Sequence, residues 1–225
     1  MRKLLAILLL LTSAIYAQDE QEQAYVKPDF KAIEQNIKNK QSALYYQKLF
    51  ERFQQADSTL TLEEKYHLYF GYSFTDAYKP YFSSDNLKEI RTLVNTDNLT
   101  KEQMERVIEL SQDAINGYPF DVSMMGYRAY FYRALGKEKL AEKEEIRANL
   151  VFDAILGTGD GMSKETCFYV INVGNEYELI NVLGMAYAGE QKLVEGKYDY
   201  LELEENDYGV YGLYFNVSRI MSSFK

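Results

Sequence analysis

This chain has few of the residues on which small secreted folds and metal sites depend: one cysteine, one histidine, three prolines and no tryptophan in 225 residues. A single thiol cannot form an internal disulfide bond, so the stability of the fold must come from its core. Cys167 lies in the apolar run 167–171 with no Lys, Arg or His beside it to stabilise a thiolate, which predicts a buried residue and not a nucleophile. One histidine and one cysteine are too few ligands for a zinc site, and we expect no metal and no cofactor.

Long apolar runs are also absent after the first residues, and none approaches the roughly 20 residues that a transmembrane helix needs. The first 17 residues contain Arg2 and Lys3, an apolar run from Leu4 to Leu11 and the small residue Ala17 before a polar stretch. This order is typical of a secretory signal peptide. We therefore expect cleavage after residue 17, export to the periplasm or the extracellular space, and no transmembrane anchor in the cleaved protein.

Basic residues are fewer than acidic ones, with 25 Lys and Arg against 34 Asp and Glu and a formal net charge of −9. The acid excess is spread along the chain, and no basic stripe interrupts it. A negative surface of this kind repels phosphate backbones, so we expect no nucleic-acid partner.

Apolar residues recur every three to four positions between residues 27 and 160, after a polar stretch at 18–26 that we expect to be a flexible tail. Two capping boxes, Thr61 with Glu64 and Thr100 with Gln103, predict helix starts. A helix from Asp121 or Ser123 to residue 135, a turn at Gly136 and a return helix over 138–156 form a helical hairpin that resembles tetratricopeptide-like repeats.

From residue 161 to 225 the spacing of apolar residues changes to two, which predicts an antiparallel meander packed on the helices. We expect strands over 167–173 and 177–183 joined by a hairpin turn at Gly174-Asn175, followed by strands near 191–194, 200–204 and 213–217. Leu201 and Leu203 would enter the core while Glu202 and Glu204 face water. The predicted fold class is α+β, with helical hairpins first and a small sheet second.

Several aromatic segments of this α-then-β chain are similar to a known family. They are 45–53, 60–72, Tyr78-Lys79-Pro80-Tyr81 and Phe215-Asn216-Val217. Together they resemble the secreted family catalogued as domain of unknown function 4919, whose members come mainly from Bacteroides-type bacteria. The resemblance covers nearly the whole cleaved chain and implies export, but it implies no activity.

Signals for catalysis are weak. His67 has no nucleophile motif to complete a triad. The glycine-rich loop at 157–161 follows a helix and precedes a strand, the reverse of the order in phosphate-binding loops. Glu202 and Glu204 would lie about 7 Å apart on one strand face, a separation used by inverting glycosidases, but a solvated strand face has the same pattern. A hydrolase is therefore the least favoured function.

Aromatic and cationic residues gather on the helix before Gly136, where Tyr127, Arg128, Tyr130, Tyr132 and Arg133 cannot all face the core. They are our candidate binding residues, with His67 as a sixth. Arg128 is expected on the outer face as a grip for a carboxylate, unless it forms an ion pair with an acid such as Glu142 or Glu145. The leading hypothesis is a non-enzymatic scaffold of the cell envelope that binds a protein or peptide segment. The alternative is a small-molecule or glycan-binding module that uses a tyrosine-rich surface of the sheet.

Overall fold

Local capping interactions start several helices of the computed structural model, which describes residues 25–223. Thr61 N donates to Glu64 Oε2 (2.8 Å) while Glu64 N donates to Thr61 Oγ1 (3.2 Å), so both halves of the first capping box are present. The second, between Thr100 and Gln103, is also complete. Asp121 caps the helix that follows, because its carboxylate accepts a hydrogen bond from Met124 N (3.0 Å). The predicted starts of these three helices are confirmed.

The helices in chain order are α2 (Phe30–Lys38), α3 (Tyr46–Gln54), α4 (Leu62–Tyr72), α5 (Leu87–Val94), α6 (Lys101–Gly117), α7 (Val122–Ala134), α8 (Glu138–Leu156), α9 (Gly174–Val182) and α10 (Ser218–Ser222). The strands are β1 (Phe168–Tyr169), β2 (Tyr187–Val194), β3 (Tyr198–Leu203) and β4 (Gly212–Asn216). The fold is α+β, as the sequence predicts. No helix among residues 25–223 is long and apolar enough to cross a membrane.

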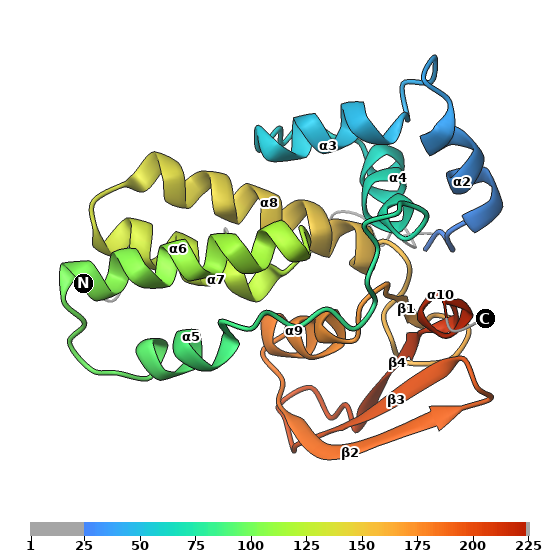
Figure 1. The fold of residues 1–225 in the computed structure, drawn as a ribbon. Coiled ribbons are helices and arrows are strands. Elements are labelled where there is room, and N and C mark those ends of the chain that lie inside the picture. The colour runs from blue at the N-terminus through green and yellow to red at the C-terminus, as the bar shows by residue number, and fades with distance from the viewer. Residues whose placement is uncertain (1–24, 224–225) are drawn as a thin grey trace, which may run out of the picture.

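The predicted helical hairpin is α7 and α8, which pack against each other along their length beside α6 (Figure 1). Gly136 lies in the turn between them with a φ of 70°, a left-handed conformation that glycine adopts without strain. The helices α2 and α3 pack on α4, and α4 contacts α8. This arrangement leaves α3 facing the C-terminal half of α6 and the middle of α8.

Strands β2, β3 and β4 form the antiparallel meander that alternation predicts, in a sheet of order β1-β4-β3-β2. Leu201 is fully buried and Leu203 is 8 % exposed, whereas Glu204 is exposed and Glu202 is half-buried in an ion pair with Lys192. The outermost strand, β2, has a register irregularity between Tyr187 and Gln191.

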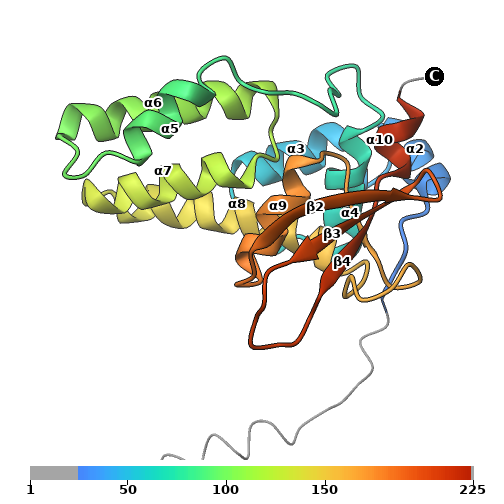
Figure 2. The same ribbon diagram turned by 90° about the horizontal axis from the view of Figure 1, so that it is seen from below.

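Two strand predictions are wrong. The segment 167–173 contains only the two-residue β1, which runs parallel to β4 and not antiparallel. The expected strand at 177–183 is part of helix α9, and no hairpin turn exists at Gly174-Asn175. The reason is that residues 176, 179 and 180 have helical spacing and are buried together on one helix face. The apparent alternation of Ile180 and Val182 concealed this spacing. Helix α9 lies between the helical layer and the sheet (Figure 2).

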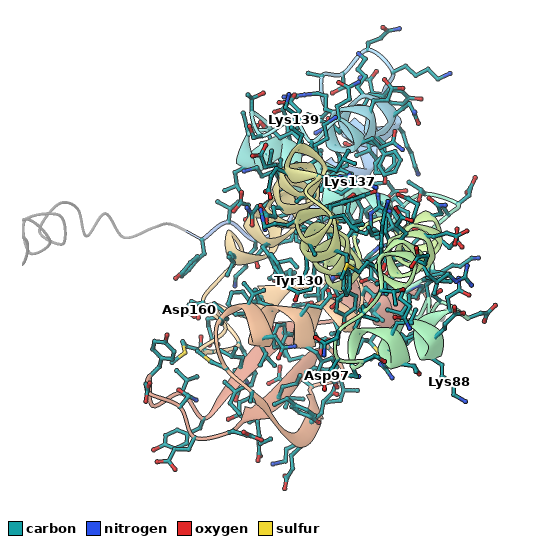
Figure 3. The ribbon with its side chains drawn as sticks, turned by 90° about the vertical axis from the view of Figure 1, so that its left-hand side faces the viewer. Lys88, Asp97, Tyr130, Lys137, Lys139 and Asp160 are labelled. Atoms are coloured by element: carbon teal, nitrogen blue, oxygen red, sulfur yellow. The ribbon has the colours of Figure 1, made fainter. Side chains whose placement is uncertain are left out.

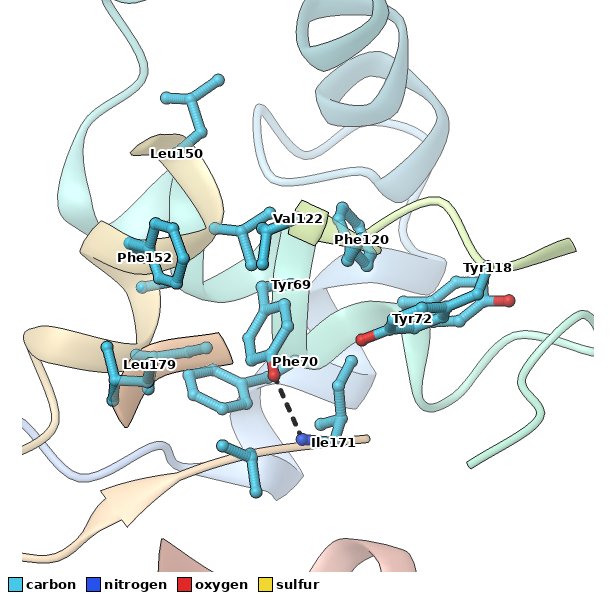
Figure 4. Packing of buried hydrophobic residues seen from close by; sticks show 14 of the residues in the cluster. Tyr69, Phe70, Tyr72, Tyr118, Phe120, Val122, Leu150, Phe152, Ile171 and Leu179 are labelled. Carbon is cyan, nitrogen blue, oxygen red and sulfur yellow. Dashed lines mark hydrogen bonds between the residues drawn. The ribbon is translucent and has the colours of Figure 1, made fainter. Parts of the chain in front are cut away.

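One core joins the helices to the sheet, and Cys167 is buried as expected. In its centre Tyr69 and Phe70 of α4 pack against Phe120 and Leu179 (Figure 4). The Tyr69 hydroxyl accepts a hydrogen bond from Ile171 N (3.2 Å) and donates to the Asn175 side chain (2.8 Å). Burying these polar groups requires such partners, so the bonds fix α4 relative to the 167–175 segment.

The expected signal peptide lies outside the described residues, and so do residues 18–24 of the expected tail. The last residue of that tail is attached to the fold: Val26 N donates to the Gly157 carbonyl (3.0 Å), so the chain is held from this residue onward.

Candidate functional site

Arg128, the predicted outward-facing grip, is buried inside the helical layer with 7 % of its surface exposed, so this prediction is wrong. Its Nε donates to Glu144 Oε1 (2.8 Å) and its Nη1 donates to the Ile108 carbonyl (3.1 Å). The guanidinium also lies 5.2 Å from the centre of the Tyr132 ring. The ion-pair alternative is therefore correct in kind, but the partner is Glu144 on the facing helix and not Glu142 or Glu145. Desolvation explains the choice, because a buried cation needs a buried anion.

The other four residues of the predicted group do not form a groove with Arg128. Tyr130 is 69 % exposed (labelled in Figure 3), and Arg133 is an exposed side chain paired with Glu138 (3.2 Å) and Glu145 (2.7 Å). Tyr127 and Tyr132 are half-buried against a small apolar cluster at the far end of α6 and α7. The residues of the predicted group follow one another closely along α7, so the helical rotation of about 100° per residue points the group in several directions.

His67 lies apart from that group, on α4, and is 6 % exposed. Asn36 Nδ2 donates to His67 Nε2 (3.1 Å), which places the ring proton on Nδ1, and Nδ1 donates to the Glu63 carbonyl (2.8 Å). It lines an apolar pocket of about 380 Å³ between α2 and α4. Both ring nitrogens therefore make hydrogen bonds within the fold.

A larger groove lies between α3 and the C-terminal half of α6, on the side of α8 that faces α3. Its volume is about 530 Å³, within the range of ligand sites in proteins. We call it the α3–α6 groove; its lining residues are Tyr46, Gln47, Phe50, Phe53, Gln54, Tyr72, Thr75, Ala77, Gln112, Ile115, Asn116, Gly117, Pro119 and Arg147.

Aromatic rings line one side of the α3–α6 groove. Tyr46 and Phe50 stack with ring centres 5.8 Å apart, and Phe50 stacks on Phe53 at 6.1 Å. The Tyr46 hydroxyl is buried and has no hydrogen-bond partner within residues 25–223. Burial raises the pKa of this phenol well above its ordinary value, so it is a neutral donor and acceptor. A buried hydroxyl without a partner is unfavourable unless a ligand or water binds it.

Amide side chains of α6 line the opposite side, where Gln112 Nε2 donates to Asn116 Oδ1 (2.9 Å), one turn further along the helix. Two further amides of the lining, Gln47 and Gln54, belong to α3. An amide carries both a donor and an acceptor, which matches the pattern of a peptide backbone or of sugar hydroxyls. The Gly117 position is also tight: a Cβ there would meet the Phe82 ring at 2.0 Å.

Arg147 is the charged residue of the groove lining, in a protein whose net charge is −9. Its side chain is 16 % exposed, and its Nη2 donates to Glu144 Oε1 (2.9 Å), the oxygen that Arg128 also contacts. Burial lowers the pKa of the guanidinium below its ordinary value. Its Nη1 donates no hydrogen bond within residues 25–223 and can receive an anionic group. The Glu144 carboxylate therefore holds Arg128 inside the layer and orients Arg147 toward the groove.

Sequence reasoning did not find this site, because α3, α6 and α8 contribute residues about 100 positions apart. The only local signal is the spacing of Glu144 and Arg147, which places them on one helix face.

Fold and groove together define an α+β protein with an aromatic and amide-lined surface site; residues 25–223 contain no cluster of three or more His, Cys, Asp or Glu residues able to hold a metal. Residues 31–225 match the family described as Domain of unknown function (DUF4919), and the chain belongs to this family. The family resemblance seen in the aromatic segments is thereby confirmed. Neither the curated proteins nor the solved structures contain a match to the chain.

Proposed function

We propose that this protein is an exported, non-enzymatic binding protein whose α3–α6 groove holds an extended acidic peptide segment of an envelope protein. The observation that supports it is the combination in one groove of stacked aromatic rings, side-chain amides and a single cation. Export rests on the signal-peptide pattern of the first 17 residues.

Each part of the groove suits a part of a peptide. The rings of Tyr46 and Phe50 offer an apolar surface for a side chain, and the amides of Gln112 and Asn116 can pair with backbone N–H and C=O groups. The free Nη1 of Arg147 suits a carboxylate, from an Asp, a Glu or the chain terminus. Because Arg147 is the one charged residue of the groove lining, it would set the register of a ligand that carries a carboxylate.

A glycan is the second candidate, and one observation on the sheet favours it. Tyr200 and Tyr214 lie opposite each other on β3 and β4 with ring centres 4.7 Å apart, and both side chains are half-buried. Adjacent tyrosine rings on an open sheet face can stack on a sugar ring.

Site variants separate the two candidates. The probes are a random peptide library and a glycan array, each incubated with residues 18–225 and with the variants Arg147→Gln, Gln112→Ala and Tyr200→Ala. We expect enrichment of peptides with a carboxylate, and a loss of about tenfold or more in affinity from Arg147→Gln, the usual effect of removing a charged hydrogen bond. Arg133→Gln is the matched control, an exposed arginine outside the groove.

The result that would contradict the proposal is peptide binding that Arg147→Gln and Gln112→Ala leave unchanged. Binding of glycans that Tyr200→Ala abolishes would move the function to the sheet. Circular dichroism and unfolding curves of each variant separate loss of binding from loss of fold.

A further inference from the structure

A second pocket, lined by charged residues of both signs, lies on the other side of the α6–α7 junction, between α9, α5 and the segment 82–84. Its volume is about 330 Å³, enough for a small molecule. We call it the α9 pocket. The polar residues that matter for its chemistry are Arg91, Tyr118, Asp121, Asn172, Glu178 and Asn181.

Two carboxyl groups from different helices meet in the α9 pocket. Glu178 Oε1 accepts a hydrogen bond from Ser123 N (3.0 Å), and its Oε2 accepts one from Asn175 Nδ2 (2.7 Å). Asp121, at the start of α7, lines the same pocket, and its carboxylate accepts a hydrogen bond from Met124 N (3.0 Å). These partners hold both groups in place as acceptors, and none of them is a cation.

An unused donor faces the same space. Asn172 is 7 % exposed, and its Oδ1 accepts a hydrogen bond from Gly174 N (2.7 Å). Its Nδ2 donates no hydrogen bond within residues 25–223, although the residue lines the pocket. This amide nitrogen is not among the buried atoms without a partner, so it is open to solvent at the pocket and can donate to an acceptor on a ligand.

A cation completes the pocket on its α5 side. Arg91 is exposed and forms no ion pair within residues 25–223, unlike Arg106 on the neighbouring helix, which pairs with Glu89 and Glu109. The pocket therefore offers two acidic acceptors together with an amide donor and a free guanidinium. Complementary charges on one small ligand would satisfy both sets.

We propose that the α9 pocket binds a small zwitterion of the amino-acid class, with its ammonium group on Asp121 and Glu178 and its carboxylate toward Asn172 and Arg91. This inference is separate from peptide binding in the α3–α6 groove. A phosphate or another simple anion would meet the two carboxyl groups, and a metal ion would find only two carboxylate ligands among the described residues.

The carboxyl pair of Asp121 and Glu178 is partly protonated near neutral pH, and the release of protons on binding would distinguish an ammonium ligand from a neutral one. Burial, together with the charge of Asp121, raises the pKa of Glu178 to about 7, and burial raises the pKa of Asp121. The other ionisable groups that line the pocket are Arg91, Tyr118 and Tyr177. An arriving ammonium favours the ionised carboxylates, so binding near neutral pH releases protons.

The test uses residues 18–225 and isothermal titration calorimetry with the free L-amino acids one by one at up to about 10 mM, above the Kd of a weak specific site. For each ligand that binds, the N-acetyl derivative lacks the ammonium and the methyl ester lacks the carboxylate. We expect at least one amino acid to bind and both derivatives to bind about tenfold more weakly or worse. The heat of binding of that amino acid should change with the ionisation enthalpy of the buffer, because the buffer takes up the released protons.

Two variants locate the site. Glu178→Gln should weaken the amino acid about tenfold or more, and Glu204→Gln, an exposed acid, should not. If Glu178→Gln fails to fold, the variant Arg91→Gln still tests the proposal, because Arg91 is exposed. This variant should weaken binding of the amino acid and leave binding of its methyl ester unchanged. Arg147→Gln must leave amino-acid binding intact, which separates this site from the α3–α6 groove.

The inference is overturned if no amino acid binds, if N-acetyl derivatives bind as well as the parent compounds, or if neutral monosaccharides compete equally. It is also overturned if binding persists in both Glu178→Gln and Arg91→Gln.

Discussion

The buried carboxyl group of Glu176 should make the protein less stable as the pH rises. Glu176 is on α9, is 0 % exposed, and neither of its carboxyl oxygens has a hydrogen-bond partner within residues 25–223. Burial, and then the charge of Asp199 on β3, raises the pKa of Glu176 well above its ordinary 4.5. Tyr81 and Tyr177 are the other ionisable groups that interact with it.

The sign and the size of this change in stability with pH follow from the linkage between proton binding and folding. Because the folded-state pKa is raised, the folded protein holds a proton that the unfolded chain releases above pH 4.5. The contribution of Glu176 to stability is complete below that pH and falls by about 1.4 kcal/mol for each pH unit above it, until the folded-state pKa is reached. Between about pH 4.5 and pH 7 the loss amounts to about 3 kcal/mol if the group stays protonated in the fold.

The assay compares Glu176→Gln with the parent protein by urea unfolding at several pH values from about 5 to 8. Gln cannot ionise, so the variant should gain on the parent by up to about 3 kcal/mol across that range. The cost of burying the glutamine amide does not depend on pH. It therefore shifts the difference in unfolding free energy between variant and parent by a constant and leaves the slope of that difference against pH unchanged. Glu204→Gln is the matched control, since Glu204 is an exposed acid on the neighbouring strand segment. Parallel stability curves for parent and Glu176→Gln would refute the reasoning.

Three further predictions concern the core, the buried ion pair and the N-terminus. Leu203→Ala should lower the free energy of unfolding by about 2–5 kcal/mol, and Glu204→Ala by well under about 1 kcal/mol; equal losses would mean that the strand register is wrong. Glu144→Ala leaves the Arg128 guanidinium buried without its anion and should cost about 3–5 kcal/mol in the same assay, so a loss near zero would show that water reaches Arg128. Exported protein should begin at Gln18 on N-terminal sequencing, and recovery of the uncleaved chain would contradict the signal peptide.

The parts of the fold that the sequence predicts are those determined by short-range contacts. A capping box joins residues three positions apart, which is why the start of α4 is correct, and α8 spans Glu138–Leu156 as expected because Gly136 ends the preceding helix. Helix α9 was missed because its apolar residues do not all lie on its buried face. Leu179 and Ile180 are buried but Val182 is exposed, so the sequence looks like strand alternation.

The candidate sites depend on tertiary contacts, and these have no local pattern. Arg128 looked exposed because its anion, Glu144, is 16 residues away on another helix. The spacing of Glu144 and Arg147 places them on one helix face but does not reveal the groove, since the groove is completed by α3, nearly a hundred residues earlier. Likewise, Glu178 and Asp121 meet only because α9 packs near the start of α7.

The irregular strand β2 has a consequence for the behaviour of the protein at high concentration. The outer edge of β2 pairs with no other strand among residues 25–223, and an open edge invites a strand from a second molecule, the first step of aggregation. Gly189, with a φ of 96°, lies within the register irregularity and interrupts the row of backbone donors and acceptors that such a strand would need. The same strand carries the ion pair of Glu190 and Lys192, and charged side chains on an edge strand disfavour pairing with a second molecule. The departure from regular pairing thus protects a four-stranded sheet from growing into an intermolecular one.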